Sequence, residues 1–304
     1  MHDTIPAALT GERVDRVVAT LAAVSRRVAA ELVENGAVTL DGATVTAGST
    51  KVHEGQRIEI TVAIAPEPRA LAADASVELT VVFADDDIIV VNKPAGVVVH
   101  PAPGHGGATL VNGLLARFPD IGEIGEPNRP GIVHRLDKGT SGLLVVARSE
   151  RAYRGLIGQL KNHRAERVYL ALVFGVPASH SGIIDAPVGR STRDRKRMAV
   201  RTEGKAARTR YSVEQAFRRP VPCALIKCEL ETGRTHQIRV HLSAIGHPVV
   251  GDPQYRGGRA SIKAPRPMLH ATQLVFDHPA TGERLSFSVP IPADMRAVLE
   301  GLEE

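Results

Sequence analysis

The stretch HRLDKGTSGLLVVA, residues 134–147, holds a single acidic side chain, Asp137, after two basic residues, His134 and Arg135. A small turn rich in glycine, threonine and serine follows, and then a continuous apolar run. Such a run is typical of a buried strand, and we expect a strand from near Ile132 with Asp137 in its path. A carboxylate at this position can be a nucleophile, a general acid or base, or the cap of a turn.

Two kinds of hydrolase also use carboxylates near such turns. The order Asp137, Lys138, Gly139, Thr140, Ser141 resembles the motif of aspartic proteases, but that mechanism needs two carboxylates that share a proton. The chain has no second copy of the motif, and a lysine replaces the threonine. A glycosidase needs two acids that flank the scissile bond, and no obvious second acid lies near Asp137. Both classes of hydrolase are therefore disfavoured, while a structural role of Asp137 as the cap of a turn remains open.

The composition of the 304 residues is that of a folded protein, with 43% hydrophobic residues. No apolar run approaches the roughly 20 residues that cross a bilayer, and the first residues do not resemble a signal peptide. We therefore expect a cytoplasmic protein without a membrane partner. Cys223 and Cys228 lie in an alternating run whose odd spacing sends them to opposite faces of a strand. We expect two buried thiols rather than a disulfide or a metal site.

Positive charge is concentrated in one segment. The net charge of the chain is +5, yet residues 190–210 contain nine basic and two acidic side chains. A basic segment in an otherwise nearly neutral chain is typical of a site for a polyanion such as RNA. Its candidate RNA contacts are Arg193, Arg195, Lys196 and Arg197. The alternative is a solvated basic loop without a ligand.

Residues 12–62 read as a small α/β module. Val14, Val17, Val18 and Leu21 have the spacing of an amphipathic helix, and a second helix is expected from Ser25, as its cap, to Gly36. A hairpin with strands 38–40 and 43–46 around Asp41-Gly42 follows, and then an alternating strand after Gly55. Each of these helices and strands is predicted from residues that are close together in the sequence.

This layout resembles an S4 domain, an RNA-binding module, over about fifty residues. The resemblance makes Arg26 and Arg27, which lie off the apolar positions, candidate RNA contacts. A dimerisation module or a purely structural subdomain is the alternative. Residues 63–80, rich in Pro and Ala without periodicity, are expected to form a linker, and residues 81–304 a larger catalytic domain.

The larger domain is expected to begin with two β-branched strands joined by a turn at Asp85–Asp87. A glycine-rich loop then leads to a helix capped by Thr109, but the Lys-Ser/Thr end of a nucleotide-binding loop is missing. We therefore expect no nucleotide cofactor. The three adjacent acids lack the alternating spacing of a calcium loop.

Later segments place two more candidate residues. The run at residues 166–176 is expected to be a core strand that carries Tyr169. A further strand is expected to end at Thr232-Gly233, and a helix capped by Thr235 should then bury Ile238, Leu242 and Ile245. Arg234 would lie at the corner between that strand and helix, where a rigid scaffold fixes the loop.

Four separated stretches, in this order, resemble the motifs of the RluA/RluD family of pseudouridine synthases. Residues 134–147 are similar to the signature with the family's aspartate. The other three are NKPAGVVVH (92–100), VYLALVFG (168–175) and ETGRTHQIRVHL (231–242). The basic stretch after Arg195 looks most like the RluD branch, which acts on large-subunit ribosomal RNA. The resemblance extends from about Val82 to the C-terminus, behind the S4-like module.

The resemblance implies an α+β pseudouridine synthase fold, with a mixed, largely antiparallel central sheet flanked by helices and loops, and a small N-terminal α/β S4-like domain. It implies that Asp137 is the catalytic group, that Tyr169 stacks on the target base, and that Arg234 pairs with Asp137. Arg135 matches the position whose side chain fills the space of the flipped base. The reaction is an isomerisation, so no cofactor and no metal are expected.

The expected partner is ribosomal RNA or a ribosomal assembly particle, bound by a monomer. Two other classes remain open. A non-catalytic RNA-binding protein would use the same surfaces as a clamp, although the chain has kept the aspartate, tyrosine and arginine set. A hydrolase with the same aspartate would release free uracil instead of an isomer.

Overall fold

The computed structural model describes residues 2–304 except 23, 25, 62–70, 102–107 and 256–261. The chain divides into two compact units, residues 1–69 and 70–304. Each unit has its own core of buried apolar side chains. The prediction of a linker at residues 63–80 falls partly on residues outside this description.

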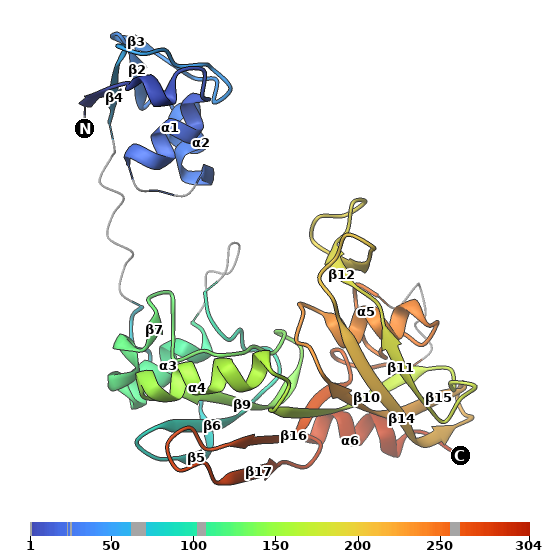
Figure 1. Cartoon of the computed structure of the whole chain (residues 1–304). Helices are drawn as coiled ribbons and strands as arrows, with labels where there is room; N and C mark the ends of the chain where they lie inside the picture. The colour runs from blue at the N-terminus through green and yellow to red at the C-terminus, as the bar shows by residue number, and fades with distance from the viewer. Residues whose placement is uncertain (1, 23, 25, 62–70, 102–107, 256–261) are drawn as a thin grey trace. The chain divides into compact units, whose positions relative to one another are not determined.

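The first unit packs two helices on a four-stranded sheet of order β1-β4-β2-β3 (Figure 1). Its elements are β1 (His2–Thr4), α1 (Val14–Leu21), α2 (Arg26–Glu34), β2 (Val38–Leu40), β3 (Ala43–Thr44) and β4 (Arg57–Ile60). The two helices and the hairpin agree with the prediction, although β3 is two residues shorter. The expected cap Ser25 and the side chain of Arg27 lie outside the described residues.

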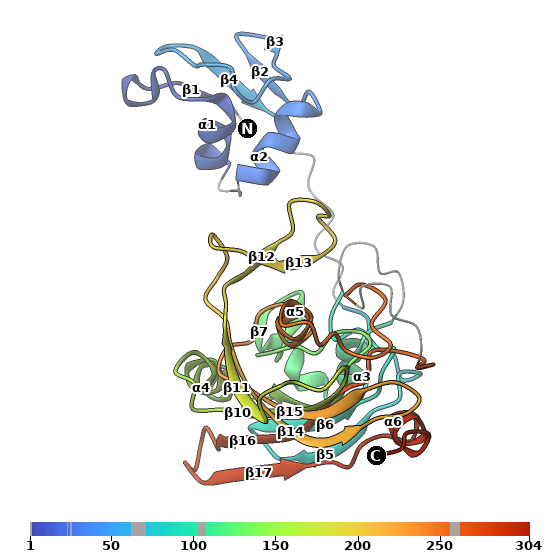
Figure 2. The same cartoon turned by 90° about the vertical axis from the view of Figure 1, so that its right-hand side faces the viewer.

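The second unit is built on a nine-stranded sheet of order β11-β14-β15-β10-β16-β9-β6-β5, with β17 paired to β16 (Figures 1 and 2). Its strands are β5 (Thr80–Ala84), β6 (Ile88–Lys93), β9 (Ser141–Ala147), β10 (Glu166–Phe174), β11 (Ser181–Asp185), β14 (Arg208–Phe217), β15 (Cys223–Leu230), β16 (Leu269–Asp277) and β17 (Arg284–Ser288). One pairing, β9 with β16, is parallel, and the others in this sheet are antiparallel. The sheet is therefore mixed and largely antiparallel, as predicted.

Helices cover both faces of this sheet. The helices are α3 (Leu110–Arg117), α4 (Glu150–Lys161), α5 (Gln237–Ala244) and α6 (Ala293–Glu300). The largest apolar cluster joins α3 and α5 to one face, through alternate residues such as Leu144 and Val146 of β9. The opposite face carries two smaller clusters, one beneath α4 and one beneath α6. Alternation along each strand thus decides which helix each side chain contacts.

The remaining elements are short. They are the 3-10 helices at Ala7–Leu9 and Pro119–Glu123, the pair β7 (Gly125–Glu126) and β8 (Arg129–Pro130), and the hairpin β12 (Val188–Arg190) and β13 (Met198–Val200). The β12–β13 hairpin lies in the connection from β11 to β14 and projects from the sheet (Figures 1 and 2). Most of the basic segment of residues 190–210 falls in this hairpin and in the start of β14.

Several local predictions are confirmed. The acids Asp85–Asp87 form the turn between β5 and β6, and Thr109 is the N-cap of α3. Cys223 and Cys228 are both buried, in clusters on opposite faces of the sheet. Burial raises the pKa of the two thiols to about 11 and about 12, respectively, so both are protonated near neutral pH.

The strand expected from Ile132 is wrong. Residues 132–140 form an irregular segment with one isolated bridge, from Ile132 to Val146, and β9 begins at Ser141. Gly142 explains the close approach that follows, because its φ is +114° and a Cβ there would lie 2.2 Å from the carbonyl oxygen of Ala271. Only a glycine lets β9 lie beside β16 at this point.

The start of α5 also differs from the prediction. The residue before the helix is His236, with left-handed φ 58° and ψ 17°, instead of Thr235. Ile238 and Leu242 are buried as expected, but Ile245 follows the helix and is 37% exposed. The helix therefore begins one residue later than predicted.

Candidate functional site

Asp137 lies in the irregular segment immediately before β9. The neighbouring Leu136 is buried and anchors the segment in the largest apolar cluster. The backbone N–H of Thr140 donates to the Asp137 carbonyl, 3.0 Å away, and the N–H of Gly96 donates to the carbonyl of Lys138, 2.7 Å away. These bonds fix the backbone on both sides, while the Asp137 side chain keeps 19% of its surface exposed.

The carboxylate of Asp137 is paired with Arg239 of α5. Nη1 of Arg239 donates to Oδ2 of Asp137 at 2.9 Å. The same guanidinium donates to both carboxylate oxygens of Asp252, at 2.6 and 3.0 Å, and to Oε1 of Gln254. Burial disfavours the charged guanidinium, but the hydrogen bond and charge of Asp252, together with Asp137, raise the pKa of Arg239. The arginine is thus held in one orientation by two acids.

Arg234 does not make the pairing that the sequence predicts. Its Nε donates to the carbonyl of Ala206 at 3.0 Å, its side chain is exposed, and it lines the same cavity as Asp137. The arginine that pairs with Asp137 is instead Arg239, the third residue of α5. From there its side chain reaches Asp137. The observed partner of Asp137 is therefore Arg239, five residues after the predicted Arg234.

Sequence reasoning missed Arg239 and Asp252, although a signal was present. In the run IRVHL, Arg239 lies between apolar residues that the helical spacing buries. Most buried arginines have an acidic partner, and Asp252 follows thirteen residues later in GDPQY. Its side chain is fully buried against Arg239.

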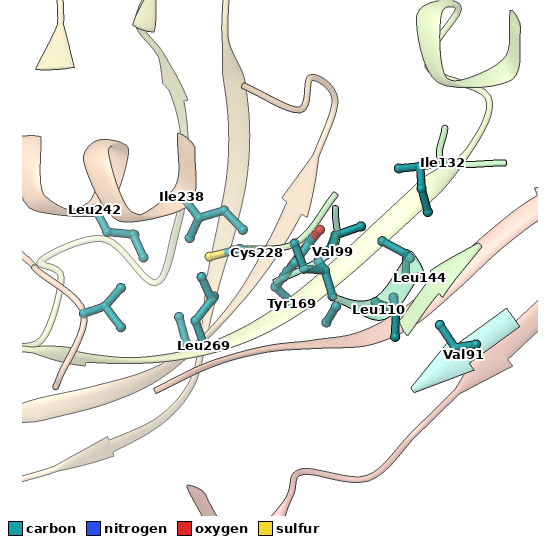
Figure 3. Close-up of a cluster of buried hydrophobic side chains, with 14 of the residues drawn as sticks. Val91, Val99, Leu110, Ile132, Leu144, Tyr169, Cys228, Ile238, Leu242 and Leu269 are labelled. Carbon is teal, nitrogen blue, oxygen red and sulfur yellow. The ribbon is translucent and has the colours of Figure 1, made fainter. Parts of the chain in front are cut away.

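Tyr169 lies on β10, two residues from Arg167. Its ring is 5% exposed, belongs to the largest apolar cluster and is drawn beside Cys228 and Val99 in Figure 3. A β-bulge separates Val168 from Tyr169 where β10 pairs with β16. Burial raises the pKa of the Tyr169 hydroxyl, so the phenol is neutral near pH 7.

One cavity of about 580 Å³ brings the predicted set together. Asp137, Tyr169, Arg135, Arg234 and Arg239 all line it. The side chain of Arg135 is exposed and forms no hydrogen bond or ion pair with any other residue that the structure describes. A carboxylate, a flat aromatic ring and a free cation thus face one space, which suits a flat polar ligand.

The basic residues of the hairpin lie elsewhere. Arg193, Arg195 and Lys196 are exposed at the β12–β13 connection and do not line the Asp137 cavity. Arg197 is half-buried, with its guanidinium 5.0 Å from the ring centroid of Tyr255. Arg26 is exposed on α2 of the first unit.

Two searches bear on other kinds of site. In the described part of the chain, no group of three or more His, Cys, Asp or Glu side chains is arranged to hold a metal ion. Within the same residues, the helices are too short or too polar to cross a membrane.

Comparison with solved structures identifies the class of fold. The human RNA pseudouridylate synthase domain containing 1 protein aligns with a TM-score of 0.56 and 31% identity, over 70% of this chain and 83% of its own. The second unit therefore has the pseudouridine synthase fold. The family model described as RNA pseudouridylate synthase matches residues 87–244, and the S4 domain model matches residues 12–58.

Relatives of nearly full length make the assignment more specific. An uncharacterized RNA pseudouridine synthase of Bacillus subtilis is 45% identical over 96% of this chain and 95% of its own. The ribosomal large subunit pseudouridine synthase D of Pseudomonas aeruginosa is 42% identical over 99% of this chain and 95% of its own. This chain belongs to the RNA pseudouridylate synthase family, and it is an RNA pseudouridine synthase with an N-terminal S4 domain.

Proposed function

We propose that the enzyme isomerises uridines of large-subunit ribosomal RNA to pseudouridine, with Asp137 as the catalytic group. The observation that carries the proposal is the carboxylate of Asp137, which is held 2.9 Å from a buried arginine in a cavity that Tyr169 also lines. The hydrogen bond from Arg239 fixes the orientation of the carboxylate. The substrate class is supported by the large-subunit synthases that are about 42% identical over nearly the whole chain.

The chemistry needs one carboxylate and no external reactant. The bond from ribose C1′ to N1 of uracil breaks, the base turns, and C1′ bonds to C5, while C5 loses a proton and N1 gains one. Tyr169 offers its ring as a stacking partner for the base in the cavity. The exposed, unpaired Arg135 is suited to fill the gap that the flipped nucleotide leaves in the RNA.

Binding of RNA would use the basic residues outside the cavity. Arg193, Arg195 and Lys196 are exposed cations suited to phosphates, as is Arg26 of the S4 domain. Arg197 would add its charge from its place over Tyr255, and Arg27 would act with Arg26. We propose a cytoplasmic monomer in which residues 12–62 bind RNA, residues 63–80 link the domains, and residues 81–304 catalyse the reaction.

The test is to map pseudouridines in ribosomal RNA from cells with the wild-type gene, with a deletion, and with Asp137→Asn. We expect the same sites to lose pseudouridine in the deletion and in Asp137→Asn, with a rate loss of about 10²- to 10⁴-fold or more in vitro. Purified Asp137→Asn should still bind the RNA. The matched control is Asp86→Asn, an exposed acid of the β5–β6 turn, which should keep full activity.

Three results would contradict the proposal. Retained activity in Asp137→Asn would exclude the aspartate as the catalytic group. Free uracil and abasic sites would indicate a hydrolase. Unchanged pseudouridine in the deletion strain, together with tight RNA binding, would favour a non-catalytic RNA-binding protein.

A further inference from the structure

Arg167 is a buried cation without an acidic partner in the wall of the Asp137 cavity. It lies on β10, two residues before Tyr169, and 7% of its surface is exposed. Its Nε is inaccessible and has no hydrogen-bond partner, and Nη2 reaches the carbonyl of Glu231 only at 3.5 Å. It makes no ion pair with a residue that the structure describes. A guanidinium stays protonated in proteins, so the site carries an uncompensated positive charge.

The other buried arginines that the structure describes in the second unit are paired. Arg239 contacts Asp137 and Asp252, and Arg266 donates to both oxygens of Asp294 at 2.6 and 2.9 Å. Burial of an unpaired charge costs several kcal/mol of folding free energy. Arg167 is therefore a charge that destabilises the fold, in a place where reaction chemistry occurs.

The residues around Arg167 leave space for its guanidinium and add no second positive charge. Gly233 lies against its guanidinium, because a Cβ at position 233 would be 2.5 Å from Nη1 of Arg167. His134 lies on the same cavity, and burial, followed by the charge of Arg167, lowers the pKa of its imidazole to about 3. The imidazole is thus neutral at pH 7 and adds no second charge beside Arg167.

Tyr169, two residues along β10, lines the same cavity as Arg167. Burial raises the pKa of its hydroxyl, and the positive charge of Arg167, whose side chain lines the same cavity, acts in the opposite direction. Tyr169 also senses the charge of Asp137. A base stacked on this ring would lie within the field of Arg167, in a site from which most water is excluded.

The reaction creates a charge of the sign that Arg167 would stabilise. When the bond from C1′ to N1 breaks, its electron pair stays on the uracil and spreads from N1 to the carbonyl oxygens O2 and O4. C5 then supplies the pair that bonds to C1′, its proton leaves, and N1 takes up a proton. Between the two bond changes the ring carries negative charge.

We propose that the uncompensated charge of Arg167 stabilises the negatively charged uracil ring between cleavage of the bond from C1′ to N1 and formation of the bond from C1′ to C5. This inference rests on the proposed function. A backbone phosphate is the poorer ligand, since Arg167 is almost completely buried on a core strand. The exposed cations Arg135 and Arg234 line the same cavity and would bind a phosphate without that cost.

The test is Arg167→Met, with three measurements on an RNA fragment that the wild-type enzyme modifies. The single-turnover rate constant should fall at least about tenfold, because a preorganised charge is lost. The Kd for the RNA should stay within about threefold. The Tm should stay the same or rise by about 2 °C or more, because a buried unpaired charge is removed.

A second substrate isolates the charge on the ring. With 5-fluorouridine in place of the target uridine, fluorine itself withdraws charge from the anionic ring. The rate of loss of the N1 glycoside should therefore fall by a clearly smaller factor in Arg167→Met than it does with uridine. Arg167→Lys, which keeps a positive charge, should recover part of the lost rate with uridine.

The matched control for stability is Arg266→Met, the same change at a buried arginine with an acidic partner, and its Tm should fall. The proposal is overturned if Arg167→Met lowers the Tm, if it weakens RNA binding without slowing the reaction, or if both substrates lose the same factor. Absence of activity in the wild-type enzyme would contradict the proposed function instead. The Tm comparison needs no activity and would still test whether the charge is uncompensated.

Discussion

The Asp137 cluster and the β12–β13 hairpin use positive charge in opposite ways. In the cluster, Arg239 is 6% exposed and is fixed by two carboxylates. In the hairpin, Arg193, Arg195 and Lys196 are exposed and their side chains form no ion pair with the rest of the described chain. The ion pairs of the cluster fix the orientation of its side chains, whereas the exposed cations of the hairpin stay available to bind a flexible polyanion.

The difference follows from desolvation. A buried charge loses its hydration and is stable only where fixed partners replace the water, so its orientation becomes part of the fold. An exposed charge keeps its hydration and contributes little to folding, but it can release counterions when it meets a phosphate. Substitutions in the two regions should therefore affect different measurements.

The largest effect is expected for Arg239→Met. Asp252 is fully buried and would lose its partner, so the free energy of unfolding should fall by about 3–5 kcal/mol in urea titrations. Arg234→Met is the matched control in the same motif. Its side chain is exposed, and its stability should stay within about 0.5 kcal/mol of the wild type. Equal losses in the two variants would contradict the assignment of Arg239 as the partner of Asp137.

Substitutions in the β12–β13 hairpin should change RNA binding without changing stability. The triple variant Arg193→Ala, Arg195→Ala and Lys196→Ala should weaken RNA binding about tenfold, and the slope of log K against log salt should fall by about 2. The unfolding curve should not change. Arg197→Ala should lower the same slope by less than 1. A triple variant with the wild-type salt slope would show that the hairpin does not meet the RNA.

The smallest effect is expected at Lys93, a buried cation whose ammonium donates to the carbonyls of Pro94 and Val97 at 2.9 Å. Burial lowers the pKa of Lys93 to about 7 from its ordinary value near 10.5. Between these values the unfolded chain binds more protons, so the wild-type stability should rise with pH above 7. Lys93→Met should remove this rise.

The difference between the two proteins should amount to about 1 kcal/mol from pH 7 to 8.5, measured by urea unfolding at each pH. The window ends there because the buried thiols Cys223 and Cys228 have raised pKa values and lower the stability at higher pH. Parallel pH profiles of the two proteins would show that Lys93 is protonated throughout.

The sequence predicted the elements that depend on local pattern. The strands around Asp85–Asp87 and the strand of Tyr169 follow from runs of β-branched and apolar residues, and the two cysteine faces follow from alternation with a period of two. The α+β class, the mixed sheet and the S4 resemblance are confirmed by the structure and by the family comparisons. The pairing of Arg234 with Asp137, which the resemblance implied, was wrong, because Arg239 of the same motif makes this contact.

Helix α5 begins directly after His236, which has a left-handed backbone. A left-handed backbone is uncommon for residues other than glycine, and although histidine adopts it more often than most, the periodicity of the following residues does not reveal it at His236. The irregular path of residues 132–140 was likewise hidden, since its hydrogen bonds go to distant partners such as Gly96. Local pattern sets which residues are buried, but tertiary contacts set which buried groups meet.

Tyr255 touches both regions of the molecule at once. The guanidinium groups of Arg197 and Arg239 each lie 5.0 Å from its ring centroid. Its hydroxyl accepts a hydrogen bond from the backbone N–H of Met198 in β13 and lies 2.9 Å from Nδ1 of His236. Movement of β13 must therefore stretch this bond or move the phenol against Arg239. RNA bound to the hairpin can therefore tighten uridine binding at Asp137 by some factor. Thermodynamic linkage then requires that a bound uridine tightens RNA binding to the hairpin by the same factor.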